Sequence, residues 1–170
     1  MDLRPLLVDT NVILEGHRIR CWAALTTRYD VQTVEKCLEE TLTGYQKRSP
    51  EEVIDQIALR QSLRAVHAVS EEQLAAAVTR EPLIGQIDPG EKQLWAHALS
   101  RKDVWILCGP DRSNVRVAVN LGFGERLVAL EPLLAAIGHR PKLPLKTHHK
   151  SDWLDSTRSQ FTLSRPGRLL

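Results

Sequence analysis

The chain of 170 residues has no long apolar run, no closely paired cysteines and no glycine-rich phosphate loop. A membrane-spanning helix needs about 20 consecutive apolar residues, and no stretch approaches that length. Cys21, Cys37 and Cys108 are odd in number and widely spaced, so the sequence supports neither a zinc knuckle nor a redox motif, and we expect small buried residues. Asp2 and Arg4 lead directly into the first apolar segment, unlike a signal peptide. These absences predict a cytoplasmic protein that does not enter a membrane, and they do not indicate a nucleotide-hydrolysing motor.

The charge of the chain is unevenly distributed. Residues 1–138 carry 16 Lys and Arg against 19 Asp and Glu, a net charge of −3, whereas residues 139–170 carry 7 against 2, a net charge of +5. Three prolines in the second segment favour an arm over a separate domain. We therefore predict a domain over 1–138 and a basic C-terminal arm over 139–170, extended or docked on the body. Such an arm is compatible with binding a polyanion, and equally with a solvated tail.

Apolar runs alternate with segments of helical periodicity along the body. The predicted strands cover 6–8, 29–34, 65–69, 104–108 and 127–130, and the predicted helices cover 12–27, 34–46, 49–64, 70–79, 88–102, 111–121 and 131–137. Strands separated by one or two helices favour a parallel sheet with helices on both faces. The predicted fold class is α/β, a three-layer α/β/α arrangement around a mostly parallel sheet of four to five strands.

Acidic residues fall at four places that this topology would gather. Because ligands of open α/β sheets bind beyond the carboxyl ends of the strands, acids that follow two neighbouring strands are expected at one edge. Carboxylates gathered closely repel one another, and a bound cation usually keeps them ionised. Oxygen ligands without a nearby His or Cys favour Mg²⁺ or Mn²⁺ over zinc. The four places are Asp9 after the first strand, Glu39 or Glu40 in the following helix, Asp88 and Glu91 at a later helix start, and Asp111 after the longest apolar strand.

Each of these acids also has a structural interpretation. Asp88 and Glu91 have the spacing of a capping box, in which both side chains satisfy N–H groups at a helix start. Asp111 after Gly-Pro has the position of an N-cap, and Glu39 and Glu40 fit a solvated helix face. Only the order of all four motifs distinguishes a metal site from four ordinary helix features.

This order of motifs resembles the PIN domain family over about residues 5–137. In that family an Asp-Thr-Asn after the first strand supplies the first metal-binding carboxylate, which Asp9-Thr10-Asn11 matches. The resemblance implies Glu39 as the second ligand, six residues after Thr33, with Glu40 as the alternative. It implies Glu91 in a Gly-Glu variant as the third ligand and Asp111 as the fourth. Family members often carry Thr or Ser two residues before the fourth acid, where this chain has Gly109.

Several neighbouring residues are candidates for supporting roles. The carboxylates of Glu40 and Asp88 lie close in sequence to the expected ligands, and Thr10 and Asn11 are expected to cap the first helix. Asn11 and Asn114 are candidates for orienting metal-bound water. Arg112 and Arg116, one helical turn apart beside Asp111, are candidates for phosphate contacts, because a guanidinium group binds phosphate oxygens as a fork.

The resemblance implies a Mg²⁺- or Mn²⁺-dependent endoribonuclease in which Asp9, Glu39, Glu91 and Asp111 hold the metal. It also implies either a VapC-type toxin with a small antitoxin partner or a stand-alone RNA-processing nuclease. The sequence is compatible with both a monomer and a homodimer. The alternative is a catalytically inactive PIN-like module that binds RNA or protein. A phosphatase that forms an aspartyl-phosphate fits less well, because it needs a second Asp where this chain has Asn11.

Overall fold

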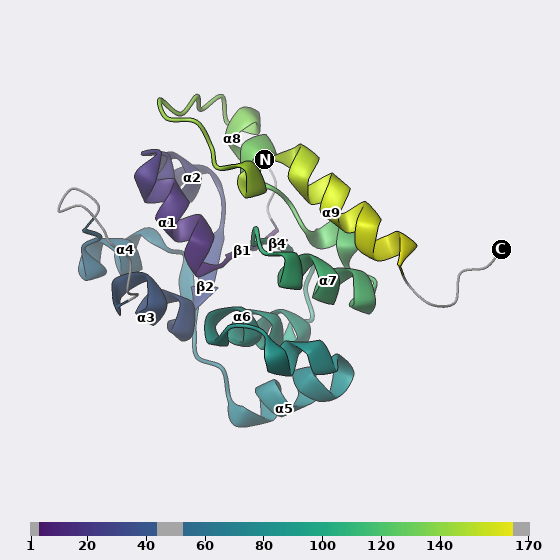
Figure 1. Ribbon diagram of the computed structural model, residues 1–170. Coiled ribbons are helices and arrows are strands. Elements are labelled where there is room, and N and C mark those ends of the chain that lie inside the picture. The colour runs from purple at the N-terminus through teal and green to yellow at the C-terminus, as the bar shows by residue number, and fades with distance from the viewer. Residues whose placement is uncertain (1–3, 44–52, 165–170) are drawn as a thin grey trace.

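The computed structural model describes residues 4–43 and 53–164, which form an α/β fold around a four-stranded parallel sheet (Figure 1). The strand order is β3-β2-β1-β4, and every neighbouring pair is parallel. The predicted fold class is therefore confirmed. The strands are β1 (Leu6–Val8), β2 (Val31–Val34), β3 (Ala65–His67) and β4 (Ile106–Cys108).

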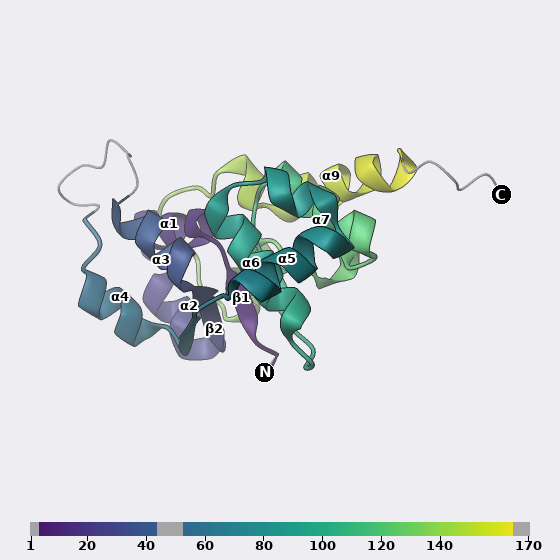
Figure 2. The ribbon, with the colours of Figure 1, turned by 90° about the horizontal axis from the view of Figure 1, so that it is seen from below.

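Helices connect consecutive strands and cover both faces of the sheet (Figures 1 and 2). The α-helices are α1 (Thr10–Arg18), α2 (Trp22–Arg28), α3 (Glu35–Thr43), α4 (Gln56–Ser62), α5 (Glu71–Arg80), α6 (Pro89–Ser100), α7 (Arg112–Leu121), α8 (Leu130–Ala136) and α9 (Ser151–Leu163). Short 3-10 helices are η2 (Pro82–Gln86), η3 (Gly124–Arg126) and η4 (Thr147–His149). None of the helices described here is long and apolar enough to cross a membrane.

The sheet separates two apolar clusters, because successive residues of a strand point to opposite faces. Leu7 and Leu107 pack with side chains of α5, α6, α7 and α9 on one face. Leu6, Val8 and Ile106 pack with side chains of α1, α2, α4 and α8 on the other. The first strand is therefore buried on both faces. The three cysteines are buried and free, as expected.

The predicted helix over 12–27 is two helices, α1 and α2, rather than one. The chain turns at Arg20, whose φ of 58° lies in the left-handed region. The turn folds Trp22 back onto Gly16, where an added Cβ would lie 3.0 Å from the indole ring. A continuous helix would have carried Trp22 away from this contact, so burial of the indole decides the local conformation.

The structure also differs from the prediction in other segments. The expected helix start at 49–52 lies outside the described residues. Residues 53–55 are not helical, and α4 begins after Asp55. The Asp55 side chain caps this helix by accepting a hydrogen bond from the Ala58 N–H at 2.7 Å. The predicted strand over 127–130 is a single parallel bridge between Leu127 and Leu107, because α8 already begins at Leu130. The segment before α6, which lies between two predicted helices, contains η2.

The C-terminal segment is not extended between residues 151 and 163, where it forms α9 beside α7 (Figures 1 and 2). Leu154 is buried in the same cluster as the inward face of α7, and Trp153 and Phe161 pack against that cluster. The described part of this segment is thus docked on the body, because its apolar residues fall on one side of a helix.

Candidate metal centre

Two of the predicted acids follow neighbouring strands and meet at the carboxyl edge of the sheet. Val8, the last residue of β1, pairs with Cys108, the last residue of β4. The Asp9 N–H continues this pairing by donating to the Cys108 carbonyl at 3.4 Å. Asp111 begins the helix that follows β4, so both carboxylates lie beyond the same two strand ends.

Asp9 is almost completely buried, at 1% exposure, and its two carboxylate oxygens have different environments. Oδ1 accepts a hydrogen bond from the Val12 N–H at 2.9 Å and caps α1. Oδ2 is buried and has no hydrogen-bond partner among the described residues. Burial raises the pKa of Asp9 from its usual 3.8 to about 7, and the charges of Asp111 and Glu40 act in the same direction.

The expectation that Thr10 and Asn11 cap the first helix is wrong. Asp9 takes that position, because its carboxylate already lies within reach of the N–H groups of the first turn. Asn11 is exposed. The Thr10 hydroxyl is directed to another carboxylate, that of Glu40, at 3.0 Å.

The structure places Glu40 rather than Glu39 in the cluster. Glu40 Oε2 accepts from Thr10, and Glu40 Oε1 accepts from the Gly90 N–H at 2.9 Å. Glu39 lies on the outer face of α3, where its carboxylate, 58% exposed, pairs with Lys36 at 3.1 Å. Consecutive residues of a helix point about 100° apart, so only one of the two can face the sheet edge, and Glu39 is the wrong choice.

Glu91 is held in a buried hydrogen-bonded chain with Asn114 and Trp95. The Trp95 indole N–H donates to Asn114 Oδ1 at 2.7 Å, and Asn114 Nδ2 donates to Glu91 Oε1 at 2.9 Å. Because an indole nitrogen only donates, it fixes the orientation of the Asn114 amide and directs its NH₂ group at Glu91. Burial raises the pKa of Glu91 from its usual 4.5 to about 9, and the charge of Asp111 adds to the increase.

The capping interpretations have opposite outcomes for the remaining two acids. Asp88 precedes α6 but makes no side-chain capping bond, and Glu91 bonds to Asn114, so the capping-box interpretation is wrong. Asp111 does cap α7, since one of its oxygens accepts from the Ser113 N–H at 2.7 Å. Asp88 is exposed at the rim, and its charge contributes to the raised pKa of Glu91.

Two glycines make room for these carboxylates. A Cβ on Gly90 would overlap the carboxylate of Glu40. A Cβ on Gly109 would lie 2.8 Å from Asn114 Nδ2 and 3.3 Å from Asp9 Oδ2. Gly109 is therefore required by the close packing of Asp9 and Asn114, which explains why no hydroxyl-bearing residue stands there.

Arg112 and Arg116 are exposed on α7 and lie against α9. The Arg112 Nη2 group donates to the Gln160 side chain at 3.1 Å. Both guanidinium groups lie over the Phe161 ring, with Cζ 5.1 Å and 6.0 Å from its centroid. Sequence reasoning identified both arginines as candidates but missed the aromatic ring that both of them contact.

The geometry brings together Asp9, Glu40, Glu91 and Asp111, each of which raises the pKa of another member or has its own pKa raised. In the part of the chain that the structure describes, no three His, Cys, Asp or Glu side chains converge tightly enough to form a ready metal shell. Asp9 Oδ2, buried and without a hydrogen-bond partner in the described ranges, is the atom that a cation would satisfy.

Sequence reasoning also missed Thr10 as a partner of Glu40 and Trp95 as the residue that orients Asn114. A signal for Trp95 existed in its spacing, four residues after Glu91 on the same face of a helix. Comparison of the chain with models of protein families, with curated proteins and with solved structures found no match in any of the three.

Proposed function

We propose that this protein is a Mg²⁺- or Mn²⁺-dependent endoribonuclease of the PIN type. The observation that carries the proposal is Asp9 Oδ2, a buried carboxylate oxygen without a partner among the described residues, at an edge shared with three further carboxylates. An orphaned buried carboxylate is costly unless a cation or a proton compensates it. Oxygen ligands favour a hard divalent ion.

In the proposed mechanism, Asp9, Glu40, Glu91 and Asp111 would hold the metal. A divalent ion bound there supplies an activated water and offsets charge on the phosphodiester. The remaining parts act by positioning: Thr10 and the Gly90 N–H orient Glu40, and Asn114 orients Glu91. Such supporting hydrogen bonds fix ligand geometry and metal affinity.

The proposed biological setting follows from the family resemblance. It is a cytoplasmic nuclease that acts on RNA, either as the toxin of a toxin–antitoxin pair, with a small antitoxin protein as partner, or as a stand-alone processing enzyme. Purification of the expressed chain from its source, followed by identification of proteins bound to it, separates these two settings.

The test is hydrolysis of a labelled single-stranded RNA with Mn²⁺ and with EDTA. We expect cleavage only with the metal, and a loss of roughly 100-fold or more in Asp9→Asn and Glu40→Gln, equivalent to several kcal/mol of lost transition-state stabilisation. Glu39→Gln is the matched control, because it removes the same charge one residue away on the exposed face. Its rate should equal that of the wild type.

Calorimetry with Mn²⁺ completes this test. Absence of divalent-ion binding by the wild type, or equal cleavage by wild type and Asp9→Asn, overturns the proposal. Retained RNA binding without cleavage would instead support a catalytically inactive RNA-binding module.

A further inference from the structure

One aromatic ring of the C-terminal helix α9 contacts the guanidinium groups of two arginines of α7. Phe161 is partly buried against the core, with the Arg112 guanidinium 5.1 Å and the Arg116 guanidinium 6.0 Å from its ring centroid. Gln160 accepts a hydrogen bond from Arg112 at 3.1 Å. Helix α9 therefore restricts two cations that would otherwise sample many rotamers on an exposed helix face.

The position of Phe161 is set by the docking of α9. Leu154, two turns earlier on the helix, is buried at 5% exposure in the cluster that α7 also lines. Because the helix is anchored there, the ring is held against α7 independently of the arginines.

The two arginines keep their hydrogen-bonding edges available. Within the described residues, no ion pair joins Arg112 or Arg116 to a carboxylate. A guanidinium group that stacks on a ring through its face still presents its N–H donors in the plane, where they can bind a phosphate as a fork.

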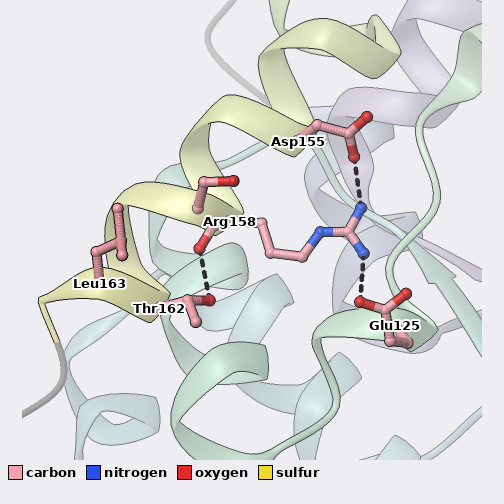
Figure 3. A pocket seen from close by; sticks show the side chains of 6 residues that line it. Glu125, Asp155, Arg158, Thr162 and Leu163 are labelled. Carbon is pink, nitrogen blue, oxygen red and sulfur yellow. Dashed lines mark hydrogen bonds and ion pairs between the residues drawn. The ribbon is translucent and has the colours of Figure 1, made fainter. Parts of the chain in front are cut away.

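Arg158 on the same helix shows the opposite arrangement (Figure 3). Its guanidinium group is bonded to Asp155 at 2.7 Å, to Glu125 at 3.2 Å and to the Gly124 carbonyl at 3.1 Å. These bonds pair its charge with two carboxylates and tie η3 to α9. Arg158 thus stabilises the contact between η3 and α9, whereas Arg112 and Arg116 are exposed on the surface.

We infer that Phe161 is a positioning residue that presents Arg112 and Arg116 to successive phosphates of an RNA strand leaving the carboxylate cluster. This inference rests on the proposed function. Arg112 follows Asp111 directly, and Arg116 lies about 6 Å further along the helix axis. Helix α9 is then part of the substrate surface and not only a cover for the core.

The test is the affinity of the full chain for a short, fluorescein-labelled single-stranded RNA, measured by anisotropy in EDTA at several salt concentrations. Arg112→Ala should weaken binding roughly tenfold, as expected for one charge-assisted contact. It should also lower the slope of log Kd against log salt by about 0.7, the value for one phosphate on a single strand.

Substitutions of Phe161 separate positioning from simple packing. Phe161→Leu keeps the apolar contact with the core and removes the ring, so we expect binding weakened about two- to fivefold with the fold intact. Phe161→Tyr keeps the ring and should bind as the wild type does. A purely structural role predicts the reverse: wild-type affinity in both variants once each is shown to be folded.

Arg80→Ala is the matched control. Arg80 also lies over a ring, that of Phe123, with Cζ 5.4 Å from the centroid. Phe123 follows the far end of α7, a helix of 10 residues and hence about 15 Å long. The control removes the same charge and the same kind of contact, but away from Asp111, and its RNA affinity should equal that of the wild type.

The outcomes distinguish this inference from the proposed function. Cleavage by the wild type with unchanged RNA affinity in Arg112→Ala and Phe161→Leu refutes the inference and leaves the nuclease standing. RNA binding that depends on both residues without any metal-dependent cleavage removes the nuclease and supports only the part of the inference in which Phe161 presents the two arginines to RNA phosphates. A wild-type chain that binds no single-stranded RNA overturns the inference outright.

Discussion

The buried carboxyl of Glu91 predicts an unusual loss of stability as the pH rises above neutrality in the absence of metal. Glu91 is 7% exposed, and its pKa in the folded protein is about 9, against 4.5 for an ordinary Glu. When the pKa of a group is higher in the folded than in the unfolded protein, its stabilising contribution is complete at a pH below the unfolded-state pKa. This contribution is lost as the pH rises through the folded-state pKa. Between pH 6.5 and 8.5 the folded chain retains a proton that the unfolded chain lacks.

The magnitude follows from this single proton. Each pH unit costs about 1.4 kcal/mol while only the folded state is protonated, so Glu91 alone should lower the free energy of unfolding by about 2.7 kcal/mol from pH 6.5 to 8.5. Asp9, whose pKa is about 7, adds a smaller decline near the lower end of this range. Urea denaturation in EDTA at intervals of half a pH unit measures this decline. In Glu91→Gln the decline should be much smaller, because the substituted amide has no proton to lose while its oxygen can still accept from Asn114.

Glu39→Gln is the control for this experiment, since Glu39 is exposed on the outer face of α3. Its curve should run parallel to that of the wild type. Addition of Mn²⁺ should reverse the wild-type decline, because the cation binds the ionised carboxylates, and a concentration 100 times Kd adds about 2.7 kcal/mol. A wild-type curve that is flat from pH 6.5 to 8.5 in EDTA would refute the reasoning about Glu91.

Two further substitutions have defined outcomes. Gly90→Ala should fold with a loss of about 1–3 kcal/mol, because its Cβ would displace the movable end of Glu40 and would lie 3.1 Å from the buried Cys37 Sγ. Calorimetry should show Mn²⁺ affinity lowered at least about tenfold as that ligand is displaced. Burial lowers the pKa of His97 from its usual 6.5 to about 4 in the folded protein. Between pH 6.5 and 4 the unfolded chain therefore binds a proton that the folded chain does not. As the pH falls through this window, His97 should lower the free energy of unfolding by up to about 3 kcal/mol. The difference between urea curves of wild type and His97→Gln isolates this contribution from that of the buried acids; no difference at pH 4.5 would contradict it.

The sheet and two of its acids were predictable because local rules and topology agree. Leu6–Val8 and Ile106–Cys108 are apolar runs bounded by polar residues, and a parallel sheet brings their carboxyl ends to one edge. Asp9 and Asp111 follow from that geometry without knowledge of any side-chain contact.

The choice between Glu39 and Glu40 failed because counting from a motif ignored the phase of the helix. Lys36, Glu39 and Thr43 form a polar stripe, whereas Cys37 and Glu40 share the inward side. The amphipathic pattern of α3 contained the answer. By contrast, the turn at Arg20 was not predictable, because a non-glycine residue with positive φ is specified by tertiary packing and by no local preference.

Asp9 shows why a capping interpretation and a metal-binding interpretation do not exclude each other. Oδ1 caps α1, a role that Asn or Ser performs equally well, whereas burial raises the pKa of this carboxyl to about 7. Capping alone therefore gives no reason for a carboxylate here. At pH 8.5 in EDTA, ionisation of the buried Asp9 lowers the free energy of unfolding of the wild type by up to about 4 kcal/mol, and Asp9→Asn avoids this loss. The substitution in turn costs about 1–3 kcal/mol, because one amide N–H is left without a hydrogen-bond partner.

The variant should thus be at least as stable as the wild type in urea while it loses metal-dependent cleavage. This opposition between stability and activity is typical of residues retained for function. A strongly destabilised Asp9→Asn would show that the carboxylate is a structural element of the sheet edge, and it would remove the main reason for placing a cation there.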